Sequence, residues 1–405
     1  MSYLAALANK RMLIVFLMGF ASGLPIALIG GTAQAWLKES GVDLALVTFF
    51  VLTGLPYTWK FIWAPVLDRI APPLLEQRRG WILISQLALA LTIFCMGLSH
   101  PESNLKFMGI CALVLAFLGA TQDIVIDAYR AEILEAEERA MGASLAILAY
   151  RLAMIVSGGL ALVMAQHLSW SSVYSCMALL MLACAVVTLR ADEPKRVAPK
   201  ERLLWETAIQ SFREFLSRPG SVEILLFVLL YKIGDVMAAA PTTAFMLDIG
   251  FSKQDIGLAV KTGGLVSTIV GGLLAGVLMP RLGTLKSLWV FGILQSATIF
   301  LFGLLALRGN DFLLMFTSVS IENLCNGMGT AAFTAFLMGL CNRQYTATQY
   351  ALLTSVMSVT RYLAGSITGS IAKEVGWFWF FTICIAAALP GLLLLTRYRR
   401  WQVTG

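Results

Sequence analysis

Eight charged side chains lie inside long apolar stretches of the sequence, with hydrophobic residues on both sides of each. They are the bases Lys60, Arg151, Lys232, Lys261 and Arg361 and the acids Asp123, Asp235 and Glu322. If these stretches cross a membrane, an ionised side chain at the centre of a span costs about 2.5–3.5 kcal/mol, so none of the eight can face lipid. We therefore expect all of them to face a central cavity or one another.

The excess of bases over acids in this group favours a cavity for an anionic solute. Arg151 and Arg361 each lie near the middle of a predicted span, and a guanidinium group can hold a carboxylate through two parallel hydrogen bonds. The alternative for each arginine is a structural ion pair. Further candidate contacts for the solute are Gln34, Lys60, Gln122, Lys232, Asp235, Lys261 and Asn323.

Two ion pairs are the structural alternative for part of this set. Lys232 and Asp235 are three residues apart, so they can pair on one face of a helix. Lys60 lies at a depth comparable to that of Asp123 and can pair with it across helices.

A carboxylate inside a membrane is also a natural proton carrier. Burial disfavours its ionised form and a nearby cation favours it, so solute binding can change its proton occupancy. Asp123, beside Gln122, is the first candidate for this role, and Glu322 is the second. The alternative for Asp123 is a purely structural role.

A second charged group follows the second apolar stretch, where Asp68 and Arg69 precede Arg78 and Arg79. Asp127 and Arg139 are expected at the same edge of the protein. Ion pairs in such a cluster can hold one conformation closed and break when it opens. We therefore predict a gating role for Asp68, Arg69, Asp127 and Arg139, with contact to the solute as the alternative.

The rest of the sequence predicts the elements that position these side chains. Of the 405 residues, 59% are hydrophobic and 13% are charged, whereas a soluble protein is typically about a quarter charged. This composition excludes a soluble enzyme, a disordered chain and a free nucleic-acid-binding protein. A membrane span needs about 20 mostly apolar residues, and we predict twelve, at 12–37, 44–67, 80–99, 105–127, 140–166, 170–189, 221–247, 254–279, 285–307, 312–340, 346–372 and 376–396.

These spans predict an all-α integral membrane protein with two pseudo-symmetric six-helix bundles, 1–190 and 221–405. The segment 191–220 between them is expected to be a cytoplasmic linker, and the apolar residues within 201–216 recur at the spacing of an amphipathic helix on the membrane face. Of the 30 Lys and Arg residues, 20 would lie on one side of the membrane and 5 on the other. Because basic residues favour the cytoplasmic side, both termini are predicted to be cytoplasmic.

The sequence contains no motif that predicts catalysis or a cofactor. Its seven cysteines have no CxxC spacing, so neither a metal site nor a disulfide framework is expected. The two histidines, His100 and His167, each lie just past an apolar run, and HExxH and Ser/His/Asp sets are absent. We expect a monomeric transporter in the lipid bilayer, with a membrane enzyme or a transporter-like receptor as the alternatives.

The two halves of the chain repeat one feature. Arg151 in the fifth predicted span and Arg361 in the eleventh are each followed by small residues. Paired halves of six spans, with a substrate site at the midplane between them, are the architecture of the major facilitator superfamily. The run 68–79 resembles the motif that follows the second span in that superfamily, although Ala64 stands where a glycine is usual.

Ten segments make a more specific resemblance. They are GFASGLPIAL (19–28), KFIWAPVLDR (60–69), RRGW (78–81), TQDIVIDAYR (121–130), AEERAMGAS (136–144), YRLAMIVSGGLAL (150–162), LYKIGDVMAAAPTTAF (230–245), VKTGGLVSTIVGG (260–272), IENLCNGMGTAAF (321–333) and LCNRQYTATQYALL (340–353). In this order, over about 11–396, they resemble the AmpG-type muropeptide permeases, which are inner-membrane transporters of Gram-negative bacteria.

The resemblance implies proton-coupled import of GlcNAc-1,6-anhydro-MurNAc, with or without its stem peptide. This import would serve peptidoglycan recycling and, in some species, β-lactamase induction. The carboxylates of such a glycopeptide agree with the excess of bases. The alternatives within transport are another anionic solute, such as acetyl-CoA, and efflux of a sugar or drug.

Overall fold

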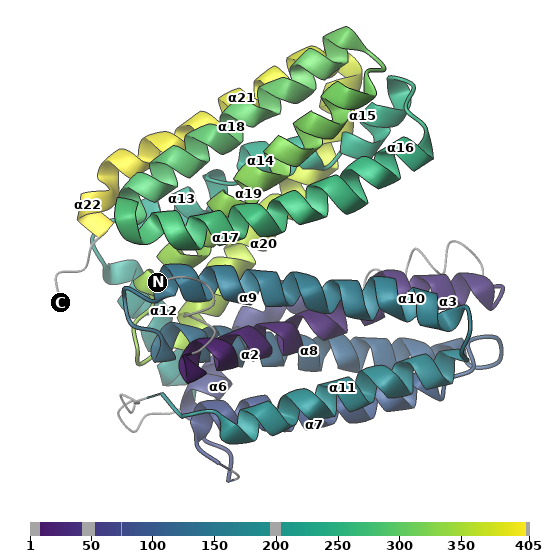
Figure 1. Ribbon diagram of the computed structural model, residues 1–405. Coiled ribbons are helices and arrows are strands. Elements are labelled where there is room, and N and C mark those ends of the chain that lie inside the picture. The colour runs from purple at the N-terminus through teal and green to yellow at the C-terminus, as the bar shows by residue number, and fades with distance from the viewer. Residues whose placement is uncertain (1–8, 43–52, 74, 195–203, 402–405) are drawn as a thin grey trace. The chain divides into compact units, whose positions relative to one another are not determined.

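The structure is a computed structural model that describes residues 9–42, 53–73, 75–194 and 204–401. Every regular element in these ranges is a helix, so the all-α prediction is confirmed (Figure 1). The helices of the first half are α2 (Lys10–Ala27), η1 (Leu28–Thr32), α3 (Ala33–Glu39), α5 (Pro56–Trp59), η3 (Lys60–Ile62), α6 (Ala64–Arg69), α7 (Gln77–Gly97), α8 (Leu105–Ile133), α9 (Arg139–Met154), η4 (Ile155–Leu160), α10 (Ala161–Ala165) and α11 (Trp170–Arg190).

A helix, α12 (Leu204–Ser217), also lies in the predicted linker, with Phe215 buried and Leu216 exposed. The remaining helices are α13 (Ser221–Leu230), α14 (Ile233–Ala239), α15 (Thr242–Asp248), α16 (Lys253–Gly257), η5 (Leu258–Gly264), α17 (Leu265–Leu282), α18 (Thr284–Arg308), α19 (Phe312–Leu340), α20 (Thr346–Val375), α21 (Trp377–Leu394), η6 (Leu395–Arg397) and α22 (Tyr398–Trp401).

Each of the twelve predicted spans contains at least one described helix, although residues 44–52 of the second span lie outside the described residues. Eight are long and apolar enough by themselves to cross a membrane. They are Lys10–Glu39, Gln77–Gly97, Leu105–Ile133, Arg139–Ala165, Trp170–Arg190, Gln254–Leu282, Thr284–Arg308 and Trp377–Trp401. The count of twelve crossings stays a prediction.

The chain divides into two compact units. The first comprises Met1–Glu138, Leu145–Ser211 and Cys341–Leu352, and the second comprises Arg139–Ser144, Phe212–Leu340 and Leu353–Gly405. Helix α20 therefore begins in the first unit and ends in the second. The expected domain limits, 1–190, 191–220 and 221–405, stay a prediction.

Two predicted spans are interrupted at a lysine. In the second span α5 ends at Trp59, and Lys60 opens the 3₁₀ segment η3. In the seventh span Lys232 lies between α13 and α14 with φ −103° and ψ 2°, outside the α-helical range. Backbone groups at such interruptions lack their usual helical partners, which is tolerated in a membrane only inside protein or beside water.

Three other spans contain a π-helical segment, and each segment includes two consecutive glycines. They are η1 with Gly30 and Gly31, η4 with Gly158 and Gly159, and η5 with Gly263 and Gly264. Gly30 has φ −91° and ψ −115°, which is outside the helical region. Glycine adopts such a conformation with little steric penalty, and π-turns are otherwise rare in helices.

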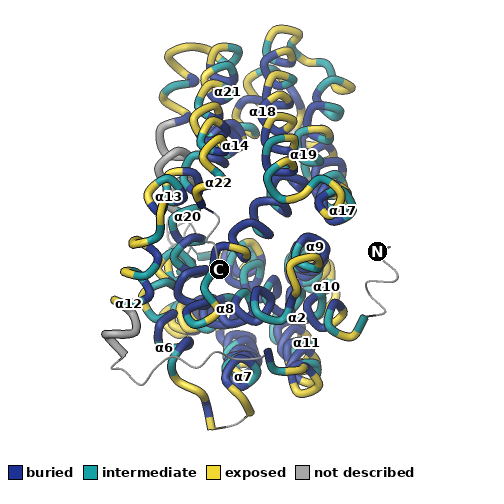
Figure 2. The backbone as a smooth tube through the Cα atoms, turned by 90° about the vertical axis from the view of Figure 1, so that its left-hand side faces the viewer, coloured by how far each residue is buried: buried dark blue, intermediate teal, exposed yellow. Residues whose placement is uncertain are grey.

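Small residues allow close packing within each unit, and large apolar residues face outward. The backbones of α17 and α19 approach so closely that a Cβ on Gly327 would overlap the carbonyl oxygen of Thr268. Small residues at helix contacts are typical of membrane bundles. Leu91 and Leu179 are 64% and 66% exposed, as lipid-facing residues are, and Figure 2 shows the alternation of buried and exposed residues along the helices.

We predict that Gly327→Ala lowers the thermal unfolding midpoint of the detergent-purified protein by about 4 °C or more. The added methyl group forces α17 and α19 apart, and overpacking of this kind costs about 1–3 kcal/mol. Gly272→Ala is the matched control, because no atom lies within 4 Å of its added Cβ. Equal midpoints for the two variants, measured by differential scanning fluorimetry, would contradict the close packing.

Candidate functional site

Asp123 on α8 lies in the centre of a polar cluster within the first unit. Its side chain accepts a hydrogen bond from the hydroxyl of Ser22 on α2. It also interacts electrostatically with Lys60, Asp127 and Arg130. This carboxylate is half-buried, and the nearby cations Lys60 and Arg130 stabilise its ionised form.

Lys60 stands between two carboxylates. Its ammonium nitrogen lies 3.8 Å from Oδ2 of Asp127, and its side chain is almost fully buried. The sequence analysis expected Lys60 to pair with Asp123. The ion pair within 4 Å is instead with Asp127, and Asp123 interacts with Lys60 electrostatically. Asp127 competes because it lies one helical turn after Asp123, which places both carboxylates on one face of α8.

The second unit contains a comparable group of one lysine and two carboxylates. Lys232 and Asp235 lie 3.4 Å apart and are both buried, so the predicted pair is confirmed. Glu322 on α19 is half-buried and interacts electrostatically with both residues. In each unit the lysine thus lies at a helix interruption and faces an acid on an uninterrupted 29-residue helix.

The two acids lie in opposite halves of their helices, each a few residues from the middle. Asp123 is ten residues before the last residue of α8, Ile133. Glu322 is ten residues after the first residue of α19, Phe312. At 1.5 Å per residue each is about 15 Å from its nearer helix end.

The other predicted solute contacts have different surroundings. Gln122 is fully buried, and neither end of its amide has a hydrogen-bond partner in the part of the chain that the structure describes. Asn323 bonds to the carbonyl oxygen of Val319 and the hydroxyl of Thr268, which is a structural arrangement. Gln34 and Arg151 are half-buried, and the side chains of Lys261 and Arg361 lie outside the described residues.

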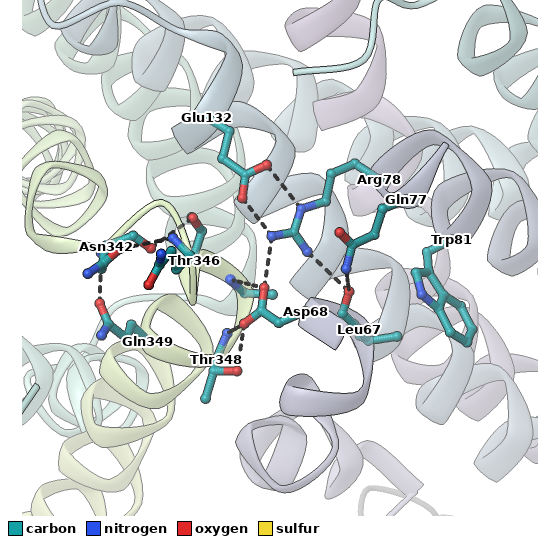
Figure 3. Close-up of polar contacts among 12 residues, drawn as sticks. Leu67, Asp68, Gln77, Arg78, Trp81, Glu132, Asn342, Thr346, Thr348 and Gln349 are labelled. Carbon is teal, nitrogen blue, oxygen red and sulfur yellow. Dashed lines mark hydrogen bonds and ion pairs between the residues drawn. The ribbon is translucent and has the colours of Figure 1, made fainter. Parts of the chain in front are cut away.

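Asp68 is the centre of a separate cluster, which we call the latch: Asp68, Arg78, Glu132, Ala347 and Thr348. Figure 3 labels Asp68, Arg78, Glu132 and Thr348. The carboxylate of Asp68 is fully buried. Oδ1 accepts from Nη2 of Arg78 at 2.8 Å and from the amide of Ala347 at 3.1 Å. Oδ2 accepts from the amide and the hydroxyl of Thr348, at 2.7 and 2.6 Å.

The latch places a negative charge at the start of α20. The first amides of a helix have no partner within the helix and carry the positive end of its dipole. Asp68 satisfies two of them, on Ala347 and Thr348, although it lies about 280 residues away in sequence. The residues 341–352 are thereby fixed within the first unit.

Arg78 anchors Asp68 from the other side. It forms two hydrogen bonds with the carboxylate of Glu132, at 2.6 and 3.1 Å, and one with the carbonyl oxygen of Leu67. Gln77 also donates to Leu67, at 2.8 Å (Figure 3). Arg78 is thus the arginine that binds Asp68. The predicted gating set named Arg69 and did not include Arg78.

The other predicted gating residues lie elsewhere. Asp127 belongs to the cluster around Lys60 and not to the latch. Arg139 opens α9 and falls in the second unit.

Glu193 fixes the start of α7. Its carboxylate accepts from the amides of Arg78 and Arg79 at 2.7 and 2.9 Å. Burial raises the pKa of Glu193, and these two hydrogen bonds oppose that shift by favouring the ionised form. The segment that follows α11 is therefore fastened to the helix that carries Arg78.

Sequence reasoning missed several contributors to the cluster around Asp123 and Lys60. Ser22 donates to Asp123, Tyr57 interacts electrostatically with Asp123, and the hydroxyl of Tyr350 accepts from Arg130. None of the three gave a signal, because a lone hydroxyl in an apolar run looks like many others. The spacing of Asp123, Asp127 and Arg130 did give one, since offsets of four and three residues place all three on one face of a helix.

Comparisons with known proteins agree with this architecture. The family model described as Major Facilitator Superfamily matches residues 11–234 and 224–402. The anhydromuropeptide permease of Escherichia coli K12 is 43% identical over 395 residues, which cover 97% of this chain and 80% of that protein.

Solved structures resemble the fold at low sequence identity. The proton:xylose symporter XylE, bound to 6-bromo-6-deoxy-D-glucose, gives a TM-score of 0.70 at 11% identity, covering 98% of this chain and 96% of that one. The transporter FucP in its outward conformation gives 0.73 at 12% identity, covering 96% and 99%. These likenesses concern the fold.

We predict that Asp68→Asn lowers the thermal unfolding midpoint by about 4 °C or more. The amide group turns donors toward Arg78 and the start of α20, and losing one partner of a buried ion pair costs about 3–5 kcal/mol. Thr348→Val removes one hydroxyl from the same latch and should have a smaller effect.

Asp192→Asn is the control for this prediction. Asp192 pairs with Lys10 at the surface, where the two side chains are 66% and 62% exposed, and such pairs contribute about 0–1 kcal/mol. A loss of stability that is no greater for Asp68→Asn than for Asp192→Asn would rule out a stabilising latch.

Proposed function

The chain belongs to the Major Facilitator Superfamily and, within it, to the family of the Escherichia coli anhydromuropeptide permease, and from this membership we propose that it imports anhydromuropeptides together with protons. The chain is a multi-pass membrane transporter and not an enzyme. The observation that carries the proposed solute is the 43% identity over 97% of the chain. The solute is GlcNAc-1,6-anhydro-MurNAc, with or without its stem peptide, and the import serves peptidoglycan recycling.

The proton carrier in this proposal is Asp123, with Glu322 as the second candidate. Asp123 is half-buried, bonds to Ser22 and has Lys60 and Arg130 nearby as cations. A carboxylate so placed is ionised when its cations face it and protonated when they turn away or are neutralised by an anionic solute. Uptake of the solute and uptake of the proton are thereby linked at one group.

The solute contacts in this proposal fall into two sets. Arg151 and Arg361 bind its carboxylates, with support from Lys60, Lys232 and Lys261. Uncharged polar groups of the sugars are bound by Gln34, Gln122 and Asn323, while Asp235 positions Lys232 through the 3.4 Å ion pair. The unpartnered amide of Gln122 supports its place in this set, since buried amides are otherwise bonded.

The latch supports an alternating-access cycle. Asp68 holds the first turn of α20 through three donors, so the arrangement in which α20 begins in the first unit is stabilised until these bonds break. Both termini lie in the cytoplasm and the transporter acts as a monomer in the inner membrane. Its partners are the anionic glycopeptide, protons and the lipid bilayer.

We expect proteoliposomes containing the protein to accumulate labelled GlcNAc-1,6-anhydro-MurNAc when a proton gradient is imposed with the higher proton concentration outside. Without the gradient the label should only equilibrate. Asp123→Asn should lower gradient-driven accumulation at least about tenfold, since the amide cannot carry a proton, and should retain exchange of labelled for unlabelled solute. Asp123→Glu restores the carboxylic acid and should recover part of the accumulation.

Asp192→Asn serves as the matched carboxylate control because its surface pair lies far from Asp123 in the sequence and is exposed. Accumulation by Asp123→Asn at the rate of this control would exclude Asp123 as the proton carrier. Failure of the wild-type protein to take up the solute under any gradient, with uptake of another anion instead, would refute the proposed substrate.

A further inference from the structure

A row of charged side chains runs along one face of α8. Asp123, Asp127 and Arg130 follow one another at offsets of four and three residues, and Lys60 from η3 stands opposite the first two. Asp127 binds both cations: Oδ2 faces Lys60 at 3.8 Å, and Oδ1 accepts from Nη2 of Arg130 at 2.8 Å. The charges therefore alternate without a gap from Asp123 to Arg130.

The row ends on α20. The same Nη2 atom of Arg130 lies 3.1 Å from the hydroxyl of Tyr350, and both side chains are buried. Tyr350 is two residues after Thr348, whose amide and hydroxyl bind Asp68 in the latch. Two separate polar contacts thus hold the first turns of α20 in the first unit, one from Asp68 and one from Arg130.

We propose that Lys60, Asp127 and Arg130 are positioning residues that transmit the protonation of Asp123 to the first turns of α20. The proposal rests on the proposed function in one respect, namely that Asp123 carries the proton. The groups that face Asp123 are Ser22 from α2, Tyr57 from α5, Lys60 from η3, and Asp127 and Arg130 from its own helix. Tyr150 from α9 faces Tyr57 in turn.

The sequence of events follows from competition for Asp127. When Asp123 is ionised, it shares Lys60 with Asp127, and Arg130 remains the close partner of Asp127. When Asp123 takes up a proton, its attraction for Lys60 is lost and the ammonium group turns fully to Asp127. Asp127 is then the one ionised acid left in the row, and Arg130 shares it with a second cation, so the position of Arg130 beside Tyr350 is less firmly fixed.

The expected consequence is a looser hold on residues 341–352. With the contact from Arg130 weakened, Asp68 alone fixes the start of α20. Protonation of Asp123 therefore favours release of the latch, which links occupancy by the proton to the conformational step. Tyr350 is the last member of the chain of contacts, and its hydroxyl can be removed while its ring is kept.

The test uses Cys341, which is half-buried and is the first residue of the segment 341–352. In the full chain, with the other six cysteines replaced by alanine, the rate at which a maleimide alkylates Cys341 in liposomes reports release of this segment. A second chain, which lacks all seven native cysteines and carries only Glu137→Cys at an exposed position between α8 and α9, measures the intrinsic reactivity of a thiol under each condition.

We expect Asp123→Asn, which imitates the protonated acid, to raise the alkylation rate of Cys341 about fivefold or more, as typical couplings between sites do. Tyr350→Phe should raise it as well, and the double variant should react no faster than Tyr350→Phe alone. Residues linked in one chain show such non-additivity, whereas independent residues have additive effects. An unchanged rate in Asp123→Asn, or additive effects in the double variant, would overturn the proposal.

A pH profile separates transmission from a structural role. Relative to the Glu137→Cys chain, alkylation of Cys341 should rise as pH falls. Lys60→Met should remove this pH dependence, while Lys60→Arg, which keeps the charge, should retain it. A Lys60→Met chain with the original pH profile would be fatal to the proposed role of Lys60. The alkylation assay contains no solute, so its result does not depend on whether the protein takes up anhydromuropeptides. If uptake is observed but the alkylation rate of Cys341 does not respond to Asp123→Asn, the inference is refuted and the proposed function is not.

Discussion

A charged group inside a bilayer needs a counter-charge within a few ångströms, and the polar architecture of this transporter follows from that requirement. Lys60 and Lys232 are both buried, and each lies within 4 Å of a carboxylate. Both lysines stand at interruptions of a helix, where backbone groups also need polar surroundings. At these two places a buried charge and an irregular backbone share the same polar surroundings.

The latch obeys the same rule at a helix end. The first amides of α20 would otherwise face a low-dielectric interior without partners, and Asp68 supplies the acceptor that the local sequence lacks. The charge of Asp68 is in turn balanced by Arg78, which Glu132 holds in place. A transporter has to break and remake such contacts in every cycle. A few ion pairs and hydrogen bonds suit this requirement better than an extensive apolar contact.

The sequence predicted the positions of the helices and of the charged residues within them better than it predicted which residues those charges contact. Apolar run lengths fixed the spans closely, as at α18 and α19, because lipid imposes one length scale on all of them. Lys232 and Asp235 were also paired correctly, since their contact lies within one turn. The contacts of Asp68 with Thr348 and of Arg130 with Tyr350 were not predicted, because 280 and 220 residues separate the partners. A lone threonine or tyrosine in the sequence also gives no indication of which distant residue it contacts.

The glycine pairs in η1, η4 and η5 have a consequence for how this sequence is compared or edited. A π-turn holds more residues than an α-turn, so the side chains that follow it are displaced by about 100° around the helix relative to an unbroken α-helix. The hydrophobic pattern on the two sides of Gly30, Gly158 or Gly263 is therefore out of phase. Deletion of one glycine that returns the π-turn to an α-turn leaves the residues on both sides facing as before, so a one-residue gap at these positions in a homologue marks the loss of the π-turn and not a rotated helix.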